Sequence, residues 1–199
     1  MKDGFTLVES FIVFFLMAII SSVLFANFPS FSRQTSLERD AQLLALAFRD
    51  AESRALSIQE SDGSFDNYFG VHVDITSEQK RKRYVLFADI NGTSFFDNPG
   101  EELRIGTLSS NTRISRICRA LRDASSLNND CSLSCLSITF ERPSPVVSVR
   151  GASGGVGCNT PLVLNEGDFE IEIESNDNTL KRCVVVWTTG TISIESNAC

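Results

Sequence analysis

The longest apolar run of the chain stands at its start. Between Phe5 and Phe28 the only charged side chain is Glu9. About 20 apolar residues in an α-helix are enough to cross the hydrocarbon core of a bilayer. A secretory signal peptide would have a basic start and a small-residue cleavage site after a shorter apolar core, and neither pattern is present here. Residues 5–28 therefore predict a transmembrane helix that stays on the mature chain.

A second helical pattern follows, over residues 29–60. Its apolar residues recur at steps of three and four, with charged residues between them. They are Leu37, Ala41, Leu44, Phe48, Ala51, Ala55 and Ile58. This spacing is typical of an amphipathic helix that buries one stripe. We expect one long helix whose second half packs on a globular head.

The pattern changes after Glu60 to short apolar runs separated by Gly, Pro, Asn, Asp and Ser. Such runs predict β-strands. The expected strands are 68–73, 83–88, 103–106, 136–141, 146–149, 169–173, 184–188 and 192–194. The last two are joined by Thr-Gly and predict a hairpin with Trp187 as a core anchor. The expected fold class is α+β, with a mainly antiparallel β head over residues 61–199.

Composition restricts the partners of this protein. The chain has 199 residues and a formal net charge of −7, which suits one globular domain with an appendage. An acidic protein is repelled by polyanions. Nucleic acid is therefore an unlikely partner unless a local basic patch exists.

All six cysteines lie in the second half of the chain: Cys118, Cys131, Cys135, Cys158, Cys183 and Cys199. An even number of cysteines in an exported domain predicts disulfides, whose pairing the spacing does not decide. A zinc site is the alternative. It is disfavoured because Cys131 and Cys135 are separated by three residues instead of two, and because His72 is the only histidine.

The segment GFTLVES, residues 4–10, resembles the processing signal of type IV prepilins and type II secretion pseudopilins. The resemblance implies that a prepilin peptidase cuts between Gly4 and Phe5, removes residues 1–4 as a leader and methylates Phe5. It also implies that Glu9, the fifth residue of the mature chain, serves assembly.

Glu9 needs a partner, because a carboxylate in apolar surroundings costs several kcal/mol unless another group offsets the cost. Cleavage would create that partner, the amine of Phe5. Glu9 of one subunit would then pair with the Phe5 amine of its neighbour. The alternative is that Glu9 lies at a membrane interface, near a helix start where the dipole favours an acid.

A second resemblance covers residues 38–104. The segments DAQLLALAFRDAESRAL and YVLFADINGTSFFDNPGEELR are similar to the minor H-type pseudopilins and related minor pilins. The resemblance implies a pilin-like fold and a structural subunit of a type IV pilus or type II secretion filament, with no enzymatic activity and no cofactor.

The implied partners are other pilin subunits, prepilin peptidase, the inner-membrane assembly platform and the lipid bilayer. The implied localisation is the cytoplasmic membrane, single-pass, with the head in the periplasm or outside the cell. The alternative function is a membrane-anchored minor pilin whose head binds DNA, a surface or a secreted substrate.

Two polar clusters could bind ions. Asp89, Asn91 and Asp97 surround Gly92 loosely as in a calcium loop, but their spacing does not fit the usual calcium pattern, and a hairpin turn is the favoured interpretation. Arginines recur every three residues at Arg113, Arg116, Arg119 and Arg122, after a basic run over 80–83. They could bind an anion such as DNA, or pair with the excess acid of the head, which is favoured.

No catalytic arrangement stands out in the sequence. His72 alternates with Val71 and Val73, which predicts a solvated strand face for the histidine. No nucleophile motif or phosphate-binding loop is present. We therefore expect no enzyme.

Overall fold

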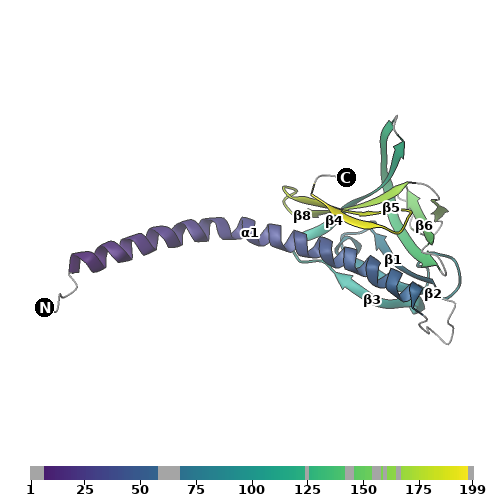
Figure 1. Cartoon of the computed structure of the whole chain (residues 1–199), viewed down its shortest axis with the longest axis horizontal. Helices are drawn as coiled ribbons and strands as arrows, with labels where there is room; N and C mark the ends of the chain where they lie inside the picture. Colours follow the sequence, from purple (N-terminus) through teal and green to yellow (C-terminus); the bar gives the residue numbers. More distant parts are fainter. Residues whose placement is uncertain are drawn as a thin grey trace. The chain divides into compact units, whose positions relative to one another are not determined.

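The fold is described from a computed structural model, which covers residues 7–57, 68–123, 126–141, 146–153, 158, 161–164 and 167–196. Helix α1 (Leu7–Leu56) comes first, and β-strands make up most of the other described residues (Figure 1). The chain divides into two compact units, Met1–Thr35 and Ser36–Cys199. The division falls within α1, so the two halves of this helix belong to different units.

The membrane part of the expected fold is wrong. No helix of the described residues combines the length and the apolar character needed to cross a bilayer. The long helix with a transmembrane first half packed on a β head is thus corrected to a helix of which only the second half shares a unit with the sheet. The single-pass anchor, and the membrane localisation inferred from it, are not supported.

The second half of α1 buries the stripe that its sequence predicts. Six of the seven expected positions are at most 2% exposed, and Ile58 lies outside the described residues. They join residues of the sheet in one apolar core. Asp40, one of the charged residues between the apolar positions, is buried as well, and its carboxylate accepts hydrogen bonds from Ser109 N (2.8 Å), Ser109 Oγ (3.0 Å) and the hydroxyl of Thr112. This acid fastens the helix to the turn before β4.

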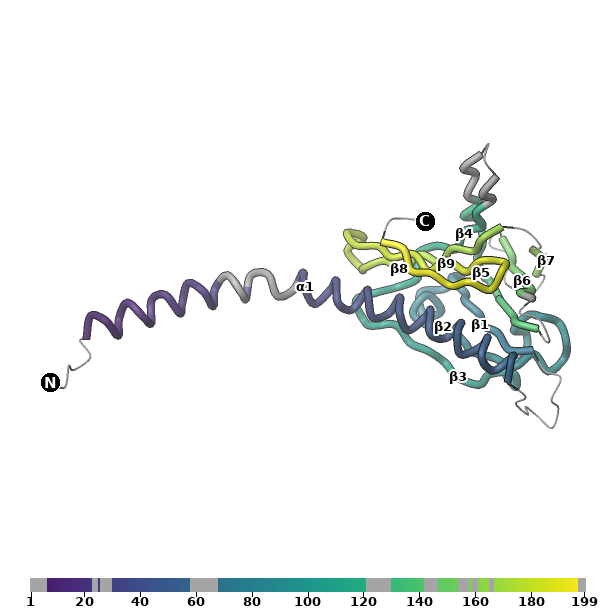
Figure 2. The backbone as a smooth tube through the Cα atoms, viewed as in Figure 1, coloured from purple at the N-terminus to yellow at the C-terminus, as the bar shows by residue number. Residues whose placement is uncertain are grey.

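The strands form one antiparallel sheet of ten strands in the described part of the chain. They are β1 (Tyr68–Asp74), β2 (Arg83–Asp89), β3 (Glu102–Thr107), β4 (Thr112–Asp123), β5 (Ser126–Glu141), β6 (Val146–Ser153), β7 (Leu162–Val163), β8 (Asp168–Ser175), β9 (Lys181–Val186) and β10 (Ile192–Glu195). Two 3-10 turns, η1 (Lys80–Lys82) and η2 (Pro99–Glu101), flank β2. The main path runs β10-β9-β8-β4-β5-β1-β2-β3, with β6 paired to β5 and β7 paired to β6 (Figure 2).

All eight expected strands are present, and β9 and β10 pair as the predicted hairpin. Strands β4 and β7 were not expected. Trp187 is only half-buried, so the prediction that it anchors the core is wrong. The core is built instead from β-branched and aromatic residues that alternate along the strands, such as Phe169, Ile171 and Ile173 of β8.

The sheet has two different faces. Phe69, Val71 and Val73 of β1 point to the face covered by α1 and belong to the large core. Successive side chains of a strand point to opposite faces, so His72 and Asp74 lie on the other face. A smaller apolar cluster of Phe95, Cys135 and Ala152 covers that outer face.

Candidate functional site

The N-terminal processing signal lies only partly in the described chain. Gly4 and Phe5 are outside it, so their cleavage and methylation remain predictions. Glu9 lies in the first turn of α1 and is exposed. Its position there is compatible both with an assembly contact and with the dipole at a helix start.

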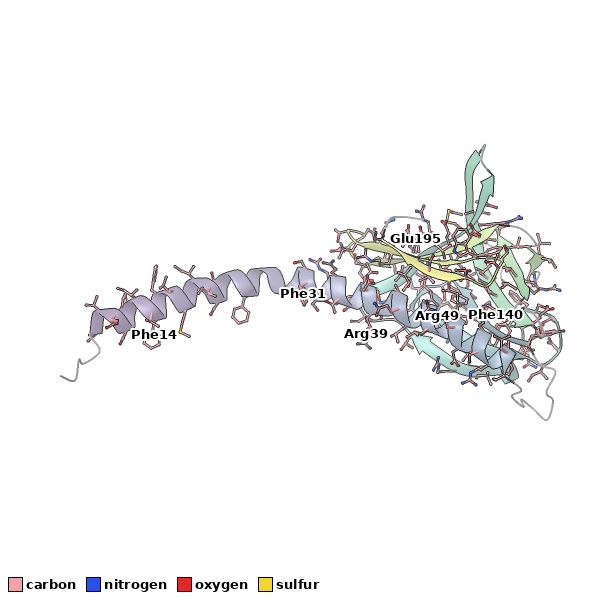
Figure 3. All side chains as sticks on the ribbon, in the orientation of Figure 1. Phe14, Phe31, Arg39, Arg49, Phe140 and Glu195 are labelled. Atoms are coloured by element: carbon pink, nitrogen blue, oxygen red, sulfur yellow. A yellow bond between two sulfur atoms is a disulfide. The ribbon has the colours of Figure 1, made fainter. Side chains whose placement is uncertain are left out.

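The helix around Glu9 is apolar on all sides. Leu7 is 84% exposed, Phe11 71%, Phe14 70% and Ile20 60%. At 100° per residue these positions and their neighbours occupy every side of the helix, and Figure 3 shows Phe14 among side chains that project in several directions. A helix that is apolar all round is normally buried in protein or lipid. This surface is the first candidate functional site.

A second site is a cleft on the outer face of the sheet. Four side chains stand in register across neighbouring strands: Val85 of β2 opposite His72 of β1, His72 opposite Ser137 of β5, and Ser137 opposite Arg150 of β6. His72, Val85 and Arg150 line the floor of the cleft, and Ser137 lies buried between His72 and Arg150. The cleft has a volume of about 630 Å³.

The loop after β2 supplies one wall of this cleft. The ring of Phe95 meets His72 edge-on at 5.3 Å between centroids, and Phe96 lies at the same distance, tilted. Backbone N–H of Phe96 donates to Ser137 Oγ at 3.3 Å, which fixes the loop to the floor. His72 is thus 6% exposed, and the expected solvated strand face is wrong, because this loop covers it.

His72 is neutral at physiological pH. Burial lowers its pKa from 6.5 to about 4; the Asp74 carboxylate raises it, whereas Lys80 and Arg83 add to the lowering. Its Nδ1 lies 2.8 Å from Ser137 Oγ, a hydrogen bond whose direction depends on the tautomer. The histidine therefore contributes a polar edge to the cleft and no charge.

The two acids of the cleft are already paired. Lys80 Nζ donates to Asp74 Oδ2 at 2.6 Å, and Thr76 donates to Oδ1 through its N–H and its hydroxyl. Burial acts to raise the pKa of Asp74, but these hydrogen bonds outweigh it and hold the pKa below its ordinary value. Asp97 accepts from Asn91 Nδ2 at 2.8 Å and from the hydroxyl of Thr93 at 3.2 Å.

Two arginines of the cleft are not engaged in this way. Within the described part of the chain, no hydrogen bond or ion pair holds the side chain of Arg83 or Arg150. Arg83 is exposed, whereas Arg150 is half-buried, and its Nε is a buried donor without a partner. A buried donor without a partner costs roughly 1–3 kcal/mol, which an acceptor in the cleft would recover.

A metal centre does not fit this cleft. His72, Asp74 and Cys158 are the one group of the described residues whose ligand atoms lie within 4.8 Å of one another. However, Cys158 is bonded to Cys135 and offers no thiolate, and Asp74 is held by Lys80 and Thr76. The thiolate is the form of cysteine that binds metals. A cation would therefore need the disulfide of Cys158 to be broken and Lys80 and Thr76 to be displaced from Asp74.

The Asp89 segment is a turn, as favoured from the sequence. The Asp89 carboxylate accepts from Thr93 N at 3.0 Å and from Ser94 N at 2.7 Å, and Gly92 has a positive φ of 71°. Asn91 and Asp97 bond to each other across the turn. These oxygens close the loop that carries Phe95 and Phe96, and the described residues show no cation-binding cluster at this place.

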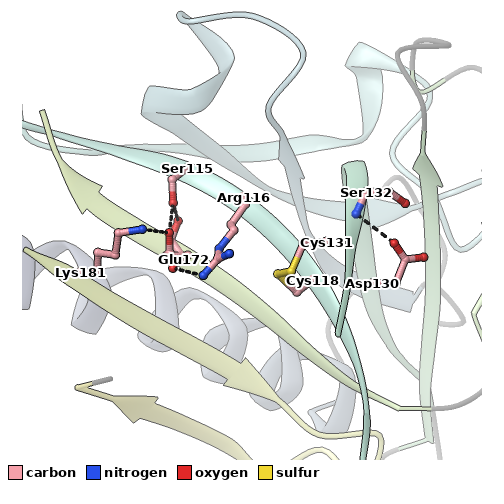
Figure 4. Close-up of a disulfide and its surroundings, with 8 residues drawn as sticks. All are labelled: Ser115, Arg116, Cys118, Asp130, Cys131, Ser132, Glu172 and Lys181. Atoms are coloured by element: carbon pink, nitrogen blue, oxygen red, sulfur yellow. Dashed lines mark hydrogen bonds and ion pairs between the residues drawn. A yellow bond between two sulfur atoms is a disulfide. The ribbon is translucent and has the colours of Figure 1, made fainter. Parts of the chain in front are cut away.

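Two members of the arginine strip, Arg113 and Arg116, pair with acids of the same head. Arg113 contacts Glu174 at 2.9 Å. Arg116 contacts Glu172 at 2.7 Å, as Figure 4 shows. Glu172 is 1% exposed in its side chain and also accepts from Ser115 and Lys181. The strip as an anion or DNA site is not supported at Arg113 and Arg116. Arg119 lies farther along β4, and the side chain of Arg122 is outside the described residues.

The five described cysteines form disulfides, so none of them offers a thiolate to zinc. Cys118 is bonded to Cys131 between β4 and β5, and Cys135 is bonded to Cys158 at the cleft (Figure 4 for the first). Cys183 is disulfide-bonded as well, and Cys199 lies outside the described residues. The second bridge ties Cys158, which lines the cleft, to Cys135 of β5.

Sequence reasoning missed the cleft as a site. In the sequence Arg83 is the end of a basic run, and no pattern there marks Arg150. The segment that carries Phe95 and Phe96 has an Asn-Gly pair, which indicates a turn and does not show that the two rings cover His72.

Comparisons with protein-family models, curated proteins and solved structures found no match for this chain.

Proposed function

We propose that this protein is a structural subunit of a filament of the type IV pilin and pseudopilin kind, in which α1 packs against the corresponding helices of other subunits. The observation that carries the proposal is the first half of α1, where apolar side chains are exposed on all sides around a single carboxylate, Glu9. The processing signal at Gly4 and Phe5 supports the same function.

The energetic argument concerns exposed apolar area. Burying such area gains roughly 25 cal/mol per Å², and a fully buried Leu or Phe side chain gains about 1.5–3 kcal/mol. Phe11, Phe14 and Phe25 are each at least 70% exposed. Neighbouring helices of the same kind would bury these residues from every side, which a single flat partner surface could not do.

Glu9 gives this packing a register. Among apolar helices, a carboxylate is tolerated only where a cation or donors meet it. Within one chain, the amine created by cleavage before Phe5 would lie about one helical turn before Glu9. A neighbouring helix displaced along its axis by about one turn would therefore bring its own Phe5 amine next to this Glu9. Partner helices would therefore be held at one stagger, as a buried polar residue fixes the register of a coiled coil.

Photo-crosslinking tests this proposal. A benzophenone side chain at Phe14 is expected to crosslink to another subunit in sheared filaments, identified by mass spectrometry. The matched control is a benzophenone at Leu46, which is also exposed (55%) and lies on the same helix but in the other compact unit. We expect at least about fivefold less crosslinking from the control. Equal crosslinking from both positions, or none from Phe14, would contradict the proposal.

Mass spectrometry of the mature chain tests the processing step. The expected product lacks residues 1–4 and carries one methyl group on the amine of Phe5. In a chain that keeps Met1, the nitrogen of Phe5 stays in a peptide bond and cannot be the cation that Glu9 requires. That result would contradict the proposed contact.

A further inference from the structure

The cleft on the outer face of the sheet carries a surplus of positive charge in an acidic protein. Its lining holds three cationic side chains, Lys80, Arg83 and Arg150, against two carboxylates, Asp74 and Asp97. Since His72 is neutral, the surplus is one positive charge. The carboxylates already have donors within the protein, so the unmatched charge rests on the two guanidinium groups.

The same cleft has an apolar wall. Phe95 is 2% exposed and Phe96 half-buried, and Val85 completes the wall from the floor. Apolar surface beside unmatched guanidinium groups is the composition of a small-ligand site, in which a few polar groups orient an apolar body. The disulfide of Cys135 and Cys158 and the closed turn at Asp89 hold both sides of the cleft in place.

We propose that this cleft binds a monocarboxylate attached to an apolar body, with the carboxylate on Arg83 and Arg150 and the apolar part on Phe95 and Phe96. Guanidinium groups suit this role because their forked donors match the two oxygens of a carboxylate. The buried Nε of Arg150, which has no partner, would gain one.

A carboxylate fits better than a phosphate. The lining has one surplus positive charge, which a monoanion neutralises, whereas a dianion would leave excess negative charge beside Asp74 and Asp97. An inorganic ion also has no apolar part that could pack against the apolar wall of the cleft. Two sources share the favoured chemistry: a small aromatic acid, and the C-terminal carboxylate of a peptide that ends in an apolar residue.

Calorimetric titration of the full chain in detergent micelles tests this inference. Benzoate and acetyl-Leu-Phe with a free carboxylate represent the two sources, and benzamide and acetyl-Leu-Phe-amide are their neutral counterparts. We expect saturable binding of at least one acid with a Kd of about 1 mM or tighter. Its neutral counterpart should bind at least about tenfold more weakly, because it cannot form charge-assisted hydrogen bonds. The tighter of the two acids identifies the source.

Variants locate the binding. Arg83→Gln and Arg150→Gln should each weaken binding of the acid at least about tenfold. Arg104→Gln is the matched control, because Arg104 is an exposed arginine that pairs with Asp50 outside the cleft, and it should change binding less than about twofold. Melting temperatures show whether each variant is folded. Arg83 is exposed, so Arg83→Gln should fold and can test the inference even if Arg150→Gln is unstable.

Binding of neither acid, equal binding of the neutral counterparts, or unchanged binding in a folded Arg83→Gln protein would overturn the inference. These outcomes are separate from filament assembly, because the cleft and the first half of α1 belong to different compact units.

Discussion

The two halves of α1 obey the same helical geometry but bury their apolar residues in different ways. In residues 37–55 the apolar residues form one stripe, and the sheet of the same unit covers it almost completely. In residues 7–20 apolar residues occupy all sides and stay about half exposed or more, from 45% at Val13 to 84% at Leu7. The second half finds its partner within the chain.

The two apolar patterns need different numbers of partner surfaces. A narrow stripe needs one surface, which the chain itself provides. Apolar residues on every side need several surfaces at once, and the chain provides none for residues 7–20 among its described residues. Residues 37–55 therefore contribute to the folded core of their own unit, and we propose that the segment before them serves assembly with other subunits.

The largest effect should come from removing one aromatic side chain in each half. Phe48→Ala leaves a cavity in the core that α1 shares with the sheet, and we expect it to lower the free energy of unfolding by about 3–5 kcal/mol. Phe14→Ala, the matched change at an exposed position, should alter it by less than about 0.5 kcal/mol. Urea unfolding of both proteins measures the two values. Similar losses would contradict the division of roles.

The disulfides should matter for one unit alone, since all cysteines lie beyond residue 117. Replacing Cys135 and Cys158 together by Ser opens a loop whose ends are 23 residues apart, which should cost about 3 kcal/mol of stability. The helicity of residues 7–35 should not change. Hydrogen exchange resolved along the chain measures both. Loss of protection in residues 7–35 would contradict the claim that the disulfides stabilise the sheet unit alone.

His72 should make the stability of the sheet unit depend on pH. Its pKa is lowered in the folded protein, so the unfolded chain binds the proton first. Stability is highest above pH 6.5 and falls as the pH approaches 4, by roughly 1–2 kcal/mol between pH 6.5 and pH 5. In His72→Gln this slope should disappear. Unfolding curves of both proteins at the two pH values measure it, and equal slopes would refute the buried neutral histidine.

Glu172 should give an effect of similar size, at lower pH. Burial acts to raise its pKa, but hydrogen bonds from Ser115, Lys181 and Arg116 outweigh it and lower the pKa. The stabilisation is therefore present above the unfolded pKa and is lost as the pH falls through the folded one. Glu172→Gln should lower stability by about 1–2 kcal/mol at pH 7 and by much less at pH 3. A constant difference across this range would show that the charge is not responsible.

Periodicity predicted the elements whose faces meet a uniform surface. The stripe from Leu37 to Ala55 and the alternation in β1 and β8 have regular spacing because each faces one apolar layer. The same rule failed for His72, because alternation tells which residues share a face and not what covers that face.

Strand β4 was missed for another physical reason. Its arginines recur every three residues, yet Arg113 and Arg116 meet Glu174 and Glu172, which are two residues apart on β8. The pairing shifts register between Ile114 and Arg116, so an extra residue is accommodated and the strand period of two is broken. A bulge of this kind has no signal in a single sequence, and the arginines therefore suggested a separate basic strip.

The acid at the start of α1 tests the central claim most directly. The measurement is the fraction of Glu9→Val protein recovered in sheared filaments relative to wild type, with Glu52→Val, an acid in the second half of α1, as the control. We predict that Glu9→Val accumulates in the cell but enters filaments at least about tenfold less, because the amine of the neighbouring subunit loses its partner. The control should enter normally. Incorporation of Glu9→Val at the wild-type level would contradict the account.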